Sequence, residues 1–424
     1  MSYSMNRVGT ANMYDSATRN LMTRQTSLAN LQDNLTSGKR VERASDDPVA
    51  AAQAERDMTR MSRIQTDQRA LDAQTSAVTQ AESSLGDATN LMQQIRELVV
   101  TAGSGTFTDS DRATVATQLQ SLRNQLLDVA NRKDTNGLPL LSALGSAVTP
   151  FLTAMGQFDG LAGQTTGSSV GIPNTLDGDA AFMFQPQRDG VFSASVSAAT
   201  PATHGLGSSA VTSTNPTQVA VDPSGNALQY QINVTYAAGT APGTLAAQYS
   251  ITSVPASAAP LDGSQTFTSP DFDPSQPVSV PVTAIPGLSL NLTGQPQAGD
   301  TMQLTLTPSK SIFDTIDTAI KDIGTAGSSS AASQAVGQAL ANIDTGMARL
   351  QTVRSYAGAL LNRADNISGN QKTRSIQLEA DRSSAVDLDM IKGVSDFQNQ
   401  QTGYQAALKS YSMVQKLSLF NFIS

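Results

Sequence analysis

Few residues of this 424-residue chain could perform chemistry at neutral pH. It has no cysteine and one histidine, His204, in the Gly/Ala/Ser-rich stretch ATHGLG. Catalysis by a histidine base needs a carboxylate that orients the ring and a nucleophile that faces it. No pattern around His204 supplies either group, so we expect an exposed loop histidine and predict that the protein is not an enzyme.

Two pairs of aspartates are the remaining candidates for a metal site. Asp177 and Asp179 lie in LDGDAA, and Asp271 and Asp273 lie in SPDFDPS. Calcium loops have more carboxylates at fixed spacing and an acidic closing residue. The pattern therefore favours turns, and we predict no metal and no cofactor. The Gly-Ser-Gly at 103–105 follows no strand pattern and indicates an ordinary loop.

The charge distribution excludes two classes of partner. The net charge is −8, and residues 146–308 contain nine Asp, one Arg and no Lys or Glu, so the flanks are balanced. No basic run favours nucleic acid, and no apolar run reaches the roughly 18 residues of a membrane span. The start, MSYSMNRVGTANMYDS, lacks the apolar segment of a secretory signal peptide, which by itself favours a cytosolic protein.

The middle of the chain differs from both flanks. Sixteen of the 18 prolines lie between Pro150 and Pro308. Alternating polar and apolar residues, rich in Val, Ile, Thr and Tyr, predict short strands separated by turns. These strands are expected at 226–238, 246–254, 278–285, 288–294 and 301–308. They indicate an all-β domain, a sandwich or open barrel, inserted mid-chain.

Both flanks show the seven-residue repeat of helices packed along their length. On the N-terminal side one position of the repeat gives Ile64, Leu71, Val78, Leu85, Met92 and Val99, and a second gives Ala81, Ala88, Ile95 and Ala102. After a loop, the pattern returns at Val115, Leu119, Leu122, Leu126 and Val129. The C-terminal flank has Val336, Leu340, Ile343, Met347, Leu350, Ala357, Leu361 and Ala364.

The two ends are each predicted to be an amphipathic helix of modest length, marginal on its own in water. The apolar stripe of the first contains Tyr14, Leu21, Leu28, Leu31 and Leu35. That of the second contains Met390, Val394, Phe397, Tyr404, Leu408, Tyr411 and, near its end, Leu417. The ends either complete an intramolecular bundle or form an assembly surface. Assembly is favoured because the insert brings the termini together and both stripes contain polar residues, Arg24 and Gln401.

A joint between two helices is predicted at 35–57, LTSGKRVERASDDPVAAAQAERD. Ser37 and Gly38 suit a helix end, since glycine adopts positive φ without steric cost. Asp46 and Asp47 precede Pro48, and the Asp47 carboxylate can accept from the free N–H groups of a helix whose first residue is Pro48. Asp387 and Asp389 similarly indicate the start of the last helix.

These patterns define the fold class: a multidomain protein with a long α-helical, coiled-coil-like bundle formed by the N- and C-terminal regions. The expected divisions are an N-terminal end helix, the two halves of a helical domain around a β-rich insert, and a C-terminal end helix: 1–45, 46–145, 146–308, 309–382 and 383–424.

The joint and both ends resemble the flagellin superfamily, whose members pair helical N- and C-terminal regions around variable inserted domains. LTSG followed by SDDP is similar to the family's joint. Pro48 followed by VAAAQA resembles the members that form the hook-filament junction, as do QLLDVANRKDTNG (125–137) and AGDTMQLTLTPSKSIFDTIDTAI (298–320). The ending from Ser384 resembles the family's C-terminal helix. LPLLSALG (138–145) departs from the aromatic-rich segment that junction proteins often have there.

The resemblance implies a structural adaptor, located outside the cell in the flagellum and exported through the flagellar type III apparatus without a cleaved leader. Its implied partners are hook-associated protein 1, flagellin, further copies of itself in a ring, and an export chaperone that covers the C-terminal helix. The 35–57 joint would connect the inner assembly helix to the long helix of the next layer. No nucleic acid and no membrane insertion are expected.

Two other functions stay open at the level of sequence. A filament flagellin has the same superfamily features, although Pro48 and the SIFDTI return argue against it. The β insert could instead bind a glycan or a host surface, but its Thr/Ser/Asp-rich and aromatic-poor composition argues against sugar stacking. A hydrolase that depends on His204 is the remotest alternative.

Overall fold

The computed structural model describes residues 10–152, 156–198, 207–208, 211–215, 218–219, 227–254, 265–268, 271, 278–282, 285–294, 300–326 and 329–423. The chain divides into two compact units. Unit 1 contains Met1–Ala70 and Ile367–Ser424, and unit 2 contains Leu71–Asn366. Two helices, α2 (Pro48–Ala102) and α7 (Ser329–Val386), contribute residues to both units.

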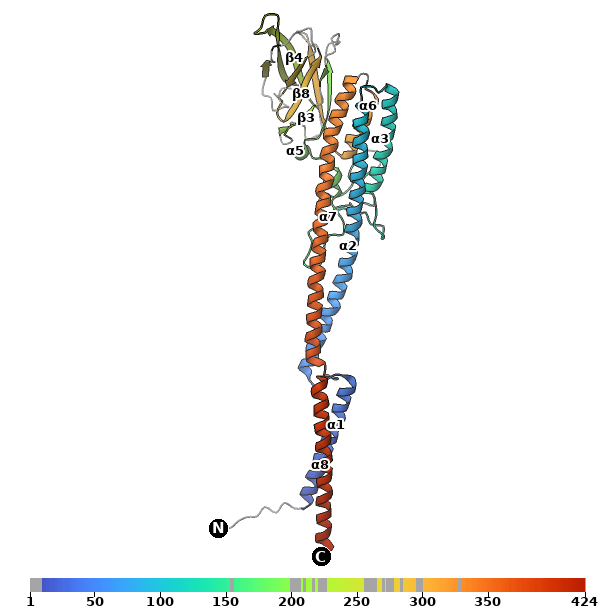
Figure 1. Cartoon of the computed structure of the whole chain (residues 1–424), viewed down its shortest axis with the longest axis vertical. Helices are drawn as coiled ribbons and strands as arrows, with labels where there is room; N and C mark the ends of the chain where they lie inside the picture. Colours follow the sequence, from blue (N-terminus) through green and yellow to red (C-terminus); the bar gives the residue numbers. More distant parts are fainter. Residues whose placement is uncertain are drawn as a thin grey trace. The chain divides into compact units, whose positions relative to one another are not determined.

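Unit 1 is helical. Its terminal helices, α1 (Thr10–Ser37) and α8 (Met390–Ile423), run side by side (Figure 1). A Cβ added at Gly393 would lie 3.2 Å from Cδ2 of Leu35, and one added at Gly403 would lie 2.8 Å from Nη1 of Arg24. Since the residue numbers rise on α8 as they fall on α1, the two helices are antiparallel.

In unit 2, α2 and α7 pack against each other along an apolar seam (Figure 1). Arg96 pairs with Asp344 at 2.7 Å and Arg354 with Glu82 at 2.6 Å, which shows that the helices are antiparallel. The predicted heptad positions of α2 from Leu71 to Ala102 are at most 2% exposed. Burying each Leu, Ile or Met of this kind contributes about 1.5–3 kcal/mol. This part of the coiled-coil prediction is confirmed.

The seam of α7 differs in detail from the prediction. Val336, Ile343, Leu350, Ala357 and Ala364 are buried as expected. Leu340, Met347 and Leu361 are only half-buried, and neighbouring positions that the pattern missed fill the seam: Ala339, Val353 and Leu360. The buried stripe of α7 keeps the spacing of three and four residues. It contains Ala339 in place of Leu340 and Leu360 in place of Leu361.

Two shorter helices, α3 (Asp109–Ala130) and α6 (Ile312–Gly324), pack beside this pair (Figure 1). A capping box between Thr108 and Asp111 begins α3, satisfying backbone donors that a helix start leaves free. Arg123 of α3 pairs with Asp317 of α6 at 2.9 Å, and its guanidinium lies 5.6 Å from the centre of the Phe313 ring.

Residues between α3 and the first strand form turns and two short helices, α4 (Gly178–Phe182) and α5 (Pro186–Asp189). Phe151, Phe182 and Phe313 are fully buried and form an aromatic cluster, with Phe151 and Phe182 edge to face at 5.2 Å. The cluster joins this connecting segment to α6.

The strands form two antiparallel sheets. The five-stranded sheet has the order β1 (Phe192–Ala198), β9 (Thr301–Pro308), β4 (Leu228–Ala238), β5 (Leu245–Val254) and β6 (Gln265–Thr268). The smaller sheet centres on β8 (Leu288–Gly294), which pairs with β2 (Gly207–Ser208), β3 (Thr212–Ser213) and β7 (Val278–Val282). In β9, alternate residues are buried, as expected for a strand with one face on a core.

Side chains from both sheets share one core, which includes Tyr230, Ile232, Leu290 and Leu304. The Tyr249 hydroxyl donates to the Pro281 carbonyl at 2.8 Å, connecting the five-stranded sheet to β7. Burial raises the pKa of Tyr230 to about 12. The arrangement is a sandwich, and the five predicted strands correspond to β4, β5, β7, β8 and β9. The predicted fold class is thus confirmed, with the strands beginning at Phe192 and residues 156–189 free of them.

Candidate functional site: the terminal helices and their joint

The predicted stripe of α1 lies along α8 but is incompletely covered. Leu21, Leu28, Leu31 and Leu35 are half-buried, and no side chain between residues 15 and 37 is fully buried. Tyr14 belongs to α1 and Leu417 to α8, but both side chains lie outside the described part of the structure. The described stripe of α1 is therefore only partly removed from water by α8.

The residues of the predicted stripe of α8 differ in how far they are covered. Phe397, Tyr404 and Tyr411, seven residues apart, are half-buried. Gly393 of α8, which faces Leu35 of α1, is buried. Met390, Val394 and Leu408 are instead 49%, 43% and 42% exposed. The seam against α1 follows Gly393, Gln400 and Ala407 between the aromatic residues, and the exposed apolar side chains lie beside the aromatic residues, on the side of the seam that α1 leaves uncovered. We call Met390, Val394 and Leu408 the outer face of α8.

A groove of about 630 Å³ lies between α1 and α8. Its walls are mostly small or polar residues: Ala17, Asn20, Leu21, Thr23, Arg24, Ser27, Gln400, Ala407, Ser410 and Tyr411. The Oε1 atom of Gln400 is buried there without a hydrogen-bond partner among the described residues. Such a buried, unsatisfied acceptor costs free energy, so the pair is not packed like a finished core.

The joint between α1 and α2 has the predicted geometry. Helix α1 ends at Ser37, and Gly38 follows with φ of 70°, in the left-handed region that favours glycine. Helix α2 begins at Pro48, and Oδ1 of Asp47 accepts from the backbone N–H groups of Val49 and Ala50 at 3.2 and 3.1 Å. Gly38 thus follows the end of α1, and Asp47 caps the helix that begins at Pro48.

Asp46 stabilises the loop itself. Its Oδ2 accepts from the N–H groups of Glu42 and Arg43, at 3.2 and 2.8 Å. These bonds, that from Arg43 first, lower the pKa of the Asp46 carboxyl, and the bond from Ala50 does the same for the pKa of Asp47. Both carboxylates are therefore held in the charged form that the backbone donors need.

The C-terminal half of the joint was not predicted. The N–H groups of Arg40 and Val41 both donate to the Val386 carbonyl, and Leu388 N–H donates to Gly38 O at 2.9 Å. The Arg40 guanidinium also donates to the Ala385 carbonyl at 2.6 Å and pairs with Asp47 at 3.3 Å. The joint thus consists of two chain segments, 38–41 and 385–388, that are hydrogen-bonded to each other. Each segment precedes the start of a helix, α2 or α8.

Asp389 begins the second of these helices. Its Oδ1 accepts from Ile391 and Lys392 N–H at 3.1 Å each, which confirms the predicted start signal of α8. Asp387 contributes through its backbone, which bridges to Lys39. Each of the two breaks between helices, 38–47 and 387–389, is therefore followed by a helix that an aspartate caps.

The residues considered for chemistry have structural roles where they are described. Asp177 accepts from Ala180 N–H as the cap of α4, and Asp271 accepts from the N–H groups of Thr240 and Ala241. Asp177 therefore begins a short helix, and Asp271 holds the turn between β4 and β5, so neither forms the local turn that its own sequence predicted. His204 and Asp273 lie outside the described residues. Across the described ranges there is no cluster of three His, Cys, Asp or Glu side chains suited to a metal, nor a helix apolar enough over a sufficient length to cross a membrane.

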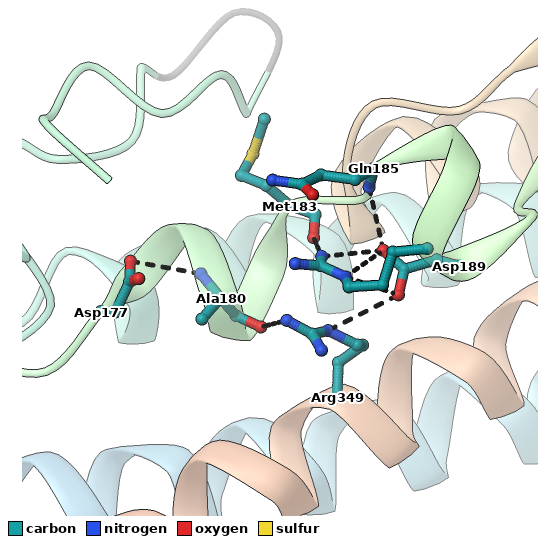
Figure 2. Close-up of polar contacts among 7 residues, drawn as sticks. Asp177, Ala180, Met183, Gln185, Asp189 and Arg349 are labelled. Atoms are coloured by element: carbon teal, nitrogen blue, oxygen red, sulfur yellow. Dashed lines mark hydrogen bonds and ion pairs between the residues drawn. The ribbon is translucent and has the colours of Figure 1, made fainter. Parts of the chain in front are cut away.

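A charged cluster that sequence reasoning missed ties the connecting segment to α7. Figure 2 shows Arg349 of α7 between Ala180 and Asp189. Its Nη2 donates to the Ala180 carbonyl at 2.6 Å, and its Nε lies 3.8 Å from Asp189. Asp189 is buried and also accepts from Arg188 and from Gln185 N–H. Burial, followed by the charge of Arg188, lowers the pKa of Arg349. The cluster positions the start of the β region and offers no open site.

Comparison with known proteins agrees with this arrangement of helices. Residues 8–145 match the bacterial flagellin N-terminal helical region, and residues 340–423 match the bacterial flagellin C-terminal helical region. Together these matches span just over half of the chain, including both terminal helices and the joint. The chain belongs to the flagellin family.

Among curated relatives, the chain is 36% identical over 156 residues to flagellar hook-associated protein 3 of Salmonella typhimurium. That match covers 36% of this chain and 49% of the relative, so the chain spans about half the length of the relative that it matches. A phase 1 flagellin of Salmonella naestved is 31% identical over 123 residues, 29% of this chain and 24% of that protein.

A solved structure, the flagellar junction protein FlgL from Legionella pneumophila, is similar over a greater length. It is 28% identical, with a TM-score of 0.53, and the similarity covers 74% of this chain and 99% of that chain. These matches to hook-associated protein 3 and to the junction protein cover more of this chain than the match to the phase 1 flagellin does.

Proposed function

We propose that this protein is a structural component of the bacterial flagellum, the adaptor that joins the hook, through hook-associated protein 1, to the flagellin filament. It acts there without catalysis, outside the cell, after export by the flagellar type III apparatus. The observation that carries the proposal is the incompletely covered α1·α8 pair, because it lies in the part of the chain that matches flagellin and hook-associated protein 3.

The inner assembly regions are proposed to be 1–45 and 383–424. Helical halves 46–145 and 309–382 connect them to the 146–308 region, which forms the outer part. On α1 the assembly residues are the stripe of Tyr14, Leu21, Leu28, Leu31 and Leu35. On α8 they are Met390, Val394, Phe397, Tyr404, Leu408, Tyr411 and Leu417. The half-buried members support pairing, and the outer face of α8 supports contact with another chain.

The proposed partners follow from the same surfaces. Copies of the chain form a ring, with hook-associated protein 1 on one side and flagellin on the other. Before export, a chaperone covers the C-terminal helix, because an apolar face with Met390, Val394 and Leu408 at 42–49% exposure favours association in water.

The decisive experiment is a strain that lacks this gene, examined for hooks, attached filaments and flagellin in the medium. Hooks without filaments, together with flagellin released outside, are the expected result. Filaments that remain attached but change in composition would refute the adaptor and favour the second candidate, a filament flagellin, which the 31% identical flagellin match supports.

Substitutions test which surface is responsible. Val394→Gln combined with Leu408→Gln changes the outer face of α8 while leaving the aromatic seam residues in place. Ile376→Gln is the matched control, because Ile376 is an exposed apolar residue of α7, at 72%, outside the proposed surface. Expression of the double variant in the deletion strain should fail to restore attached filaments, whereas the control should restore them. Restoration by both would show that the outer face is not an assembly surface.

A further inference from the structure

The methionine residues of the chain differ sharply in exposure between its two units. Among described side chains, those exposed by more than a third are Met22, Met58, Met390 and Met413, all in unit 1, at 63%, 44%, 49% and 54%. In unit 2, Met92 and Met302 are 0% and 1% exposed, and Met183 and Met347 are half-buried. Reactive thioether sulfur is thus concentrated at the terminal helices and at the start of α2.

Met390 has a particular position in this set. It is the first residue of α8, and Leu408 follows 18 residues later, about five helical turns, so both side chains point to the same side. Val394 lies one turn away on that side, and all three are between 42% and 49% exposed. Met390 therefore belongs to the outer face of α8, whereas Met58 is on α2 and belongs to neither stripe of the end helices.

We infer that Met390 is an oxidant-sensitive site. Its conversion to methionine sulfoxide by hydrogen peroxide prevents the outer face of α8 from joining hook-associated protein 1 on the hook. The inference rests on the proposed function for its consequence, but not for the chemistry. In that reaction a sulfur lone pair attacks one peroxide oxygen, a sulfur–oxygen bond forms and the oxygen–oxygen bond breaks. The other oxygen leaves as water, the sulfur is oxidised by two electrons, and the peroxide is reduced.

The sulfoxide changes the chemistry of the surface at one point. An apolar, flexible thioether becomes a polar group with a strong acceptor oxygen, which disrupts methionine-containing interfaces. The acceptor would be buried in an apolar contact beside Val394 and Leu408, where burial without a hydrogen bond is unfavourable. Since the chain has no cysteine, no thiol of its own consumes the oxidant first.

A competition within one sample tests this without any substitution. The purified full-length chain is treated with hydrogen peroxide until about half of Met390 is oxidised, as measured from the gain of about 16 Da per sulfoxide in its peptide. The sample is then added to hooks isolated from the deletion strain, which are pelleted. Sulfoxide content is compared between the pelleted and the free chain.

Met390 sulfoxide should be depleted in the pellet by about tenfold, the change expected from one unfavourable polar burial. Met58 sulfoxide should be equal in both fractions, and Met92 should stay unoxidised while the chain is folded. Equal Met390 sulfoxide in pellet and supernatant would overturn the inference, as would protection of Met390 from peroxide. If untreated chain does not pellet with hooks, the proposed function fails, and the inference fails with it.

Two variants give an independent test. Met390→Gln places a polar amide of similar length where the sulfoxide would be, and it should pellet about tenfold less than the wild type without any peroxide. Met58→Gln is the matched control and should pellet as the wild type does. Equal pelleting of both variants would show that polarity at Met390 has no effect on joining, which would overturn the inference.

Discussion

Asp189 is predicted to contribute more to stability than Arg349, although each charge lies in the same cluster. The Asp189 side chain is 5% exposed, and Oδ2 accepts from Gln185 N–H at 2.9 Å and from Arg188 Nη2 at 2.8 Å. Asp189→Ala removes these bonds together. It also removes the carboxylate that lies 3.8 Å from Nε of Arg349, whose side chain is 19% exposed. Breaking a buried pair in this way costs about 3–5 kcal/mol.

Arg349→Ala removes less. Its bond to the Ala180 carbonyl at 2.6 Å is lost, but Asp189 keeps Arg188 and Gln185 as partners. The loss of one hydrogen bond from a charged group is worth about 1.5–3 kcal/mol. The ranking follows from the number of partners that each residue holds, because both variants remove a single charge.

Hydrogen exchange measured by mass spectrometry tests the ranking. In peptides covering 177–191, where Asp189 N–H donates to Gln185 O and Phe184 N–H to Lys310 O, protected amides should exchange faster. The expected increase is roughly 100-fold or more in Asp189→Ala and roughly tenfold in Arg349→Ala, if local opening controls exchange.

Asp344→Ala is the matched control, because it breaks the Arg96–Asp344 pair, whose side chains are 43% and 50% exposed. Such exposed pairs contribute about 1 kcal/mol or less, so exchange in 177–191 should stay unchanged. Equal acceleration in Asp189→Ala and Arg349→Ala, or none beyond the control, would refute the reasoning.

Three further predictions concern other parts of the chain. Leu85→Ala, at a fully buried position of α2, should destabilise the protein by about 2–5 kcal/mol in thermal unfolding, and Val100→Ala, at an exposed position of the same helix, by about 0.5 kcal/mol or less. Because the folded-state pKa of Asp47 is lowered, chiefly by the bond from Ala50, its capping contribution should be complete above its ordinary pKa and lost as the pH falls through the lowered value. The amide shifts of Val49 and Ala50 should report that loss, and Asp47→Asn should abolish their titration. Burial, then Asp177, raises the folded-state pKa of Asp179, so its contribution is complete below its unfolded pKa and lost as the pH rises through the raised value. Asp179→Asn should therefore be more stable than the wild type at neutral pH and equal to it in acid; a lower melting temperature at neutral pH would contradict this.

The helices and strands could be predicted because their signals are local. In α2, large apolar residues occupy every seventh position from Leu71 to Val99, and each is at most 2% exposed. The cap by Asp47 needed only the neighbouring Pro48. In α8 the same method placed Val394, Gln401 and Leu408 in the seam, but all three are exposed. The true seam contains Gly393, Gln400 and Ala407 at those turns, and none of them has a strong apolar signal.

The rest of the candidate site depends on contacts between distant segments. Arg40 donates to Ala385, 345 residues away, and Arg349 donates to Ala180, 169 residues away. Neither arginine has a local sequence feature that distinguishes it from the other arginines of the chain. The pairing of 38–41 with 385–388 is a matter of backbone bonds that any residue except proline could make, so residue types carry no signal for it.

The contrast between the two helical pairs explains why assembly is the better account of the termini. In unit 2, the α2 seam from Val78 to Ala102 is 0% exposed, so apolar burial is complete within one chain. In unit 1, α1 between residues 15 and 37 has no buried side chain, and neither has α8 between 390 and 413, where the one buried residue is Gly393. Helices of 28 and 34 residues gain little from propensity alone and depend on the burial of an apolar face. We therefore propose that the missing burial comes from a second chain, packed against the outer face of α8 where Met390, Val394 and Leu408 are exposed.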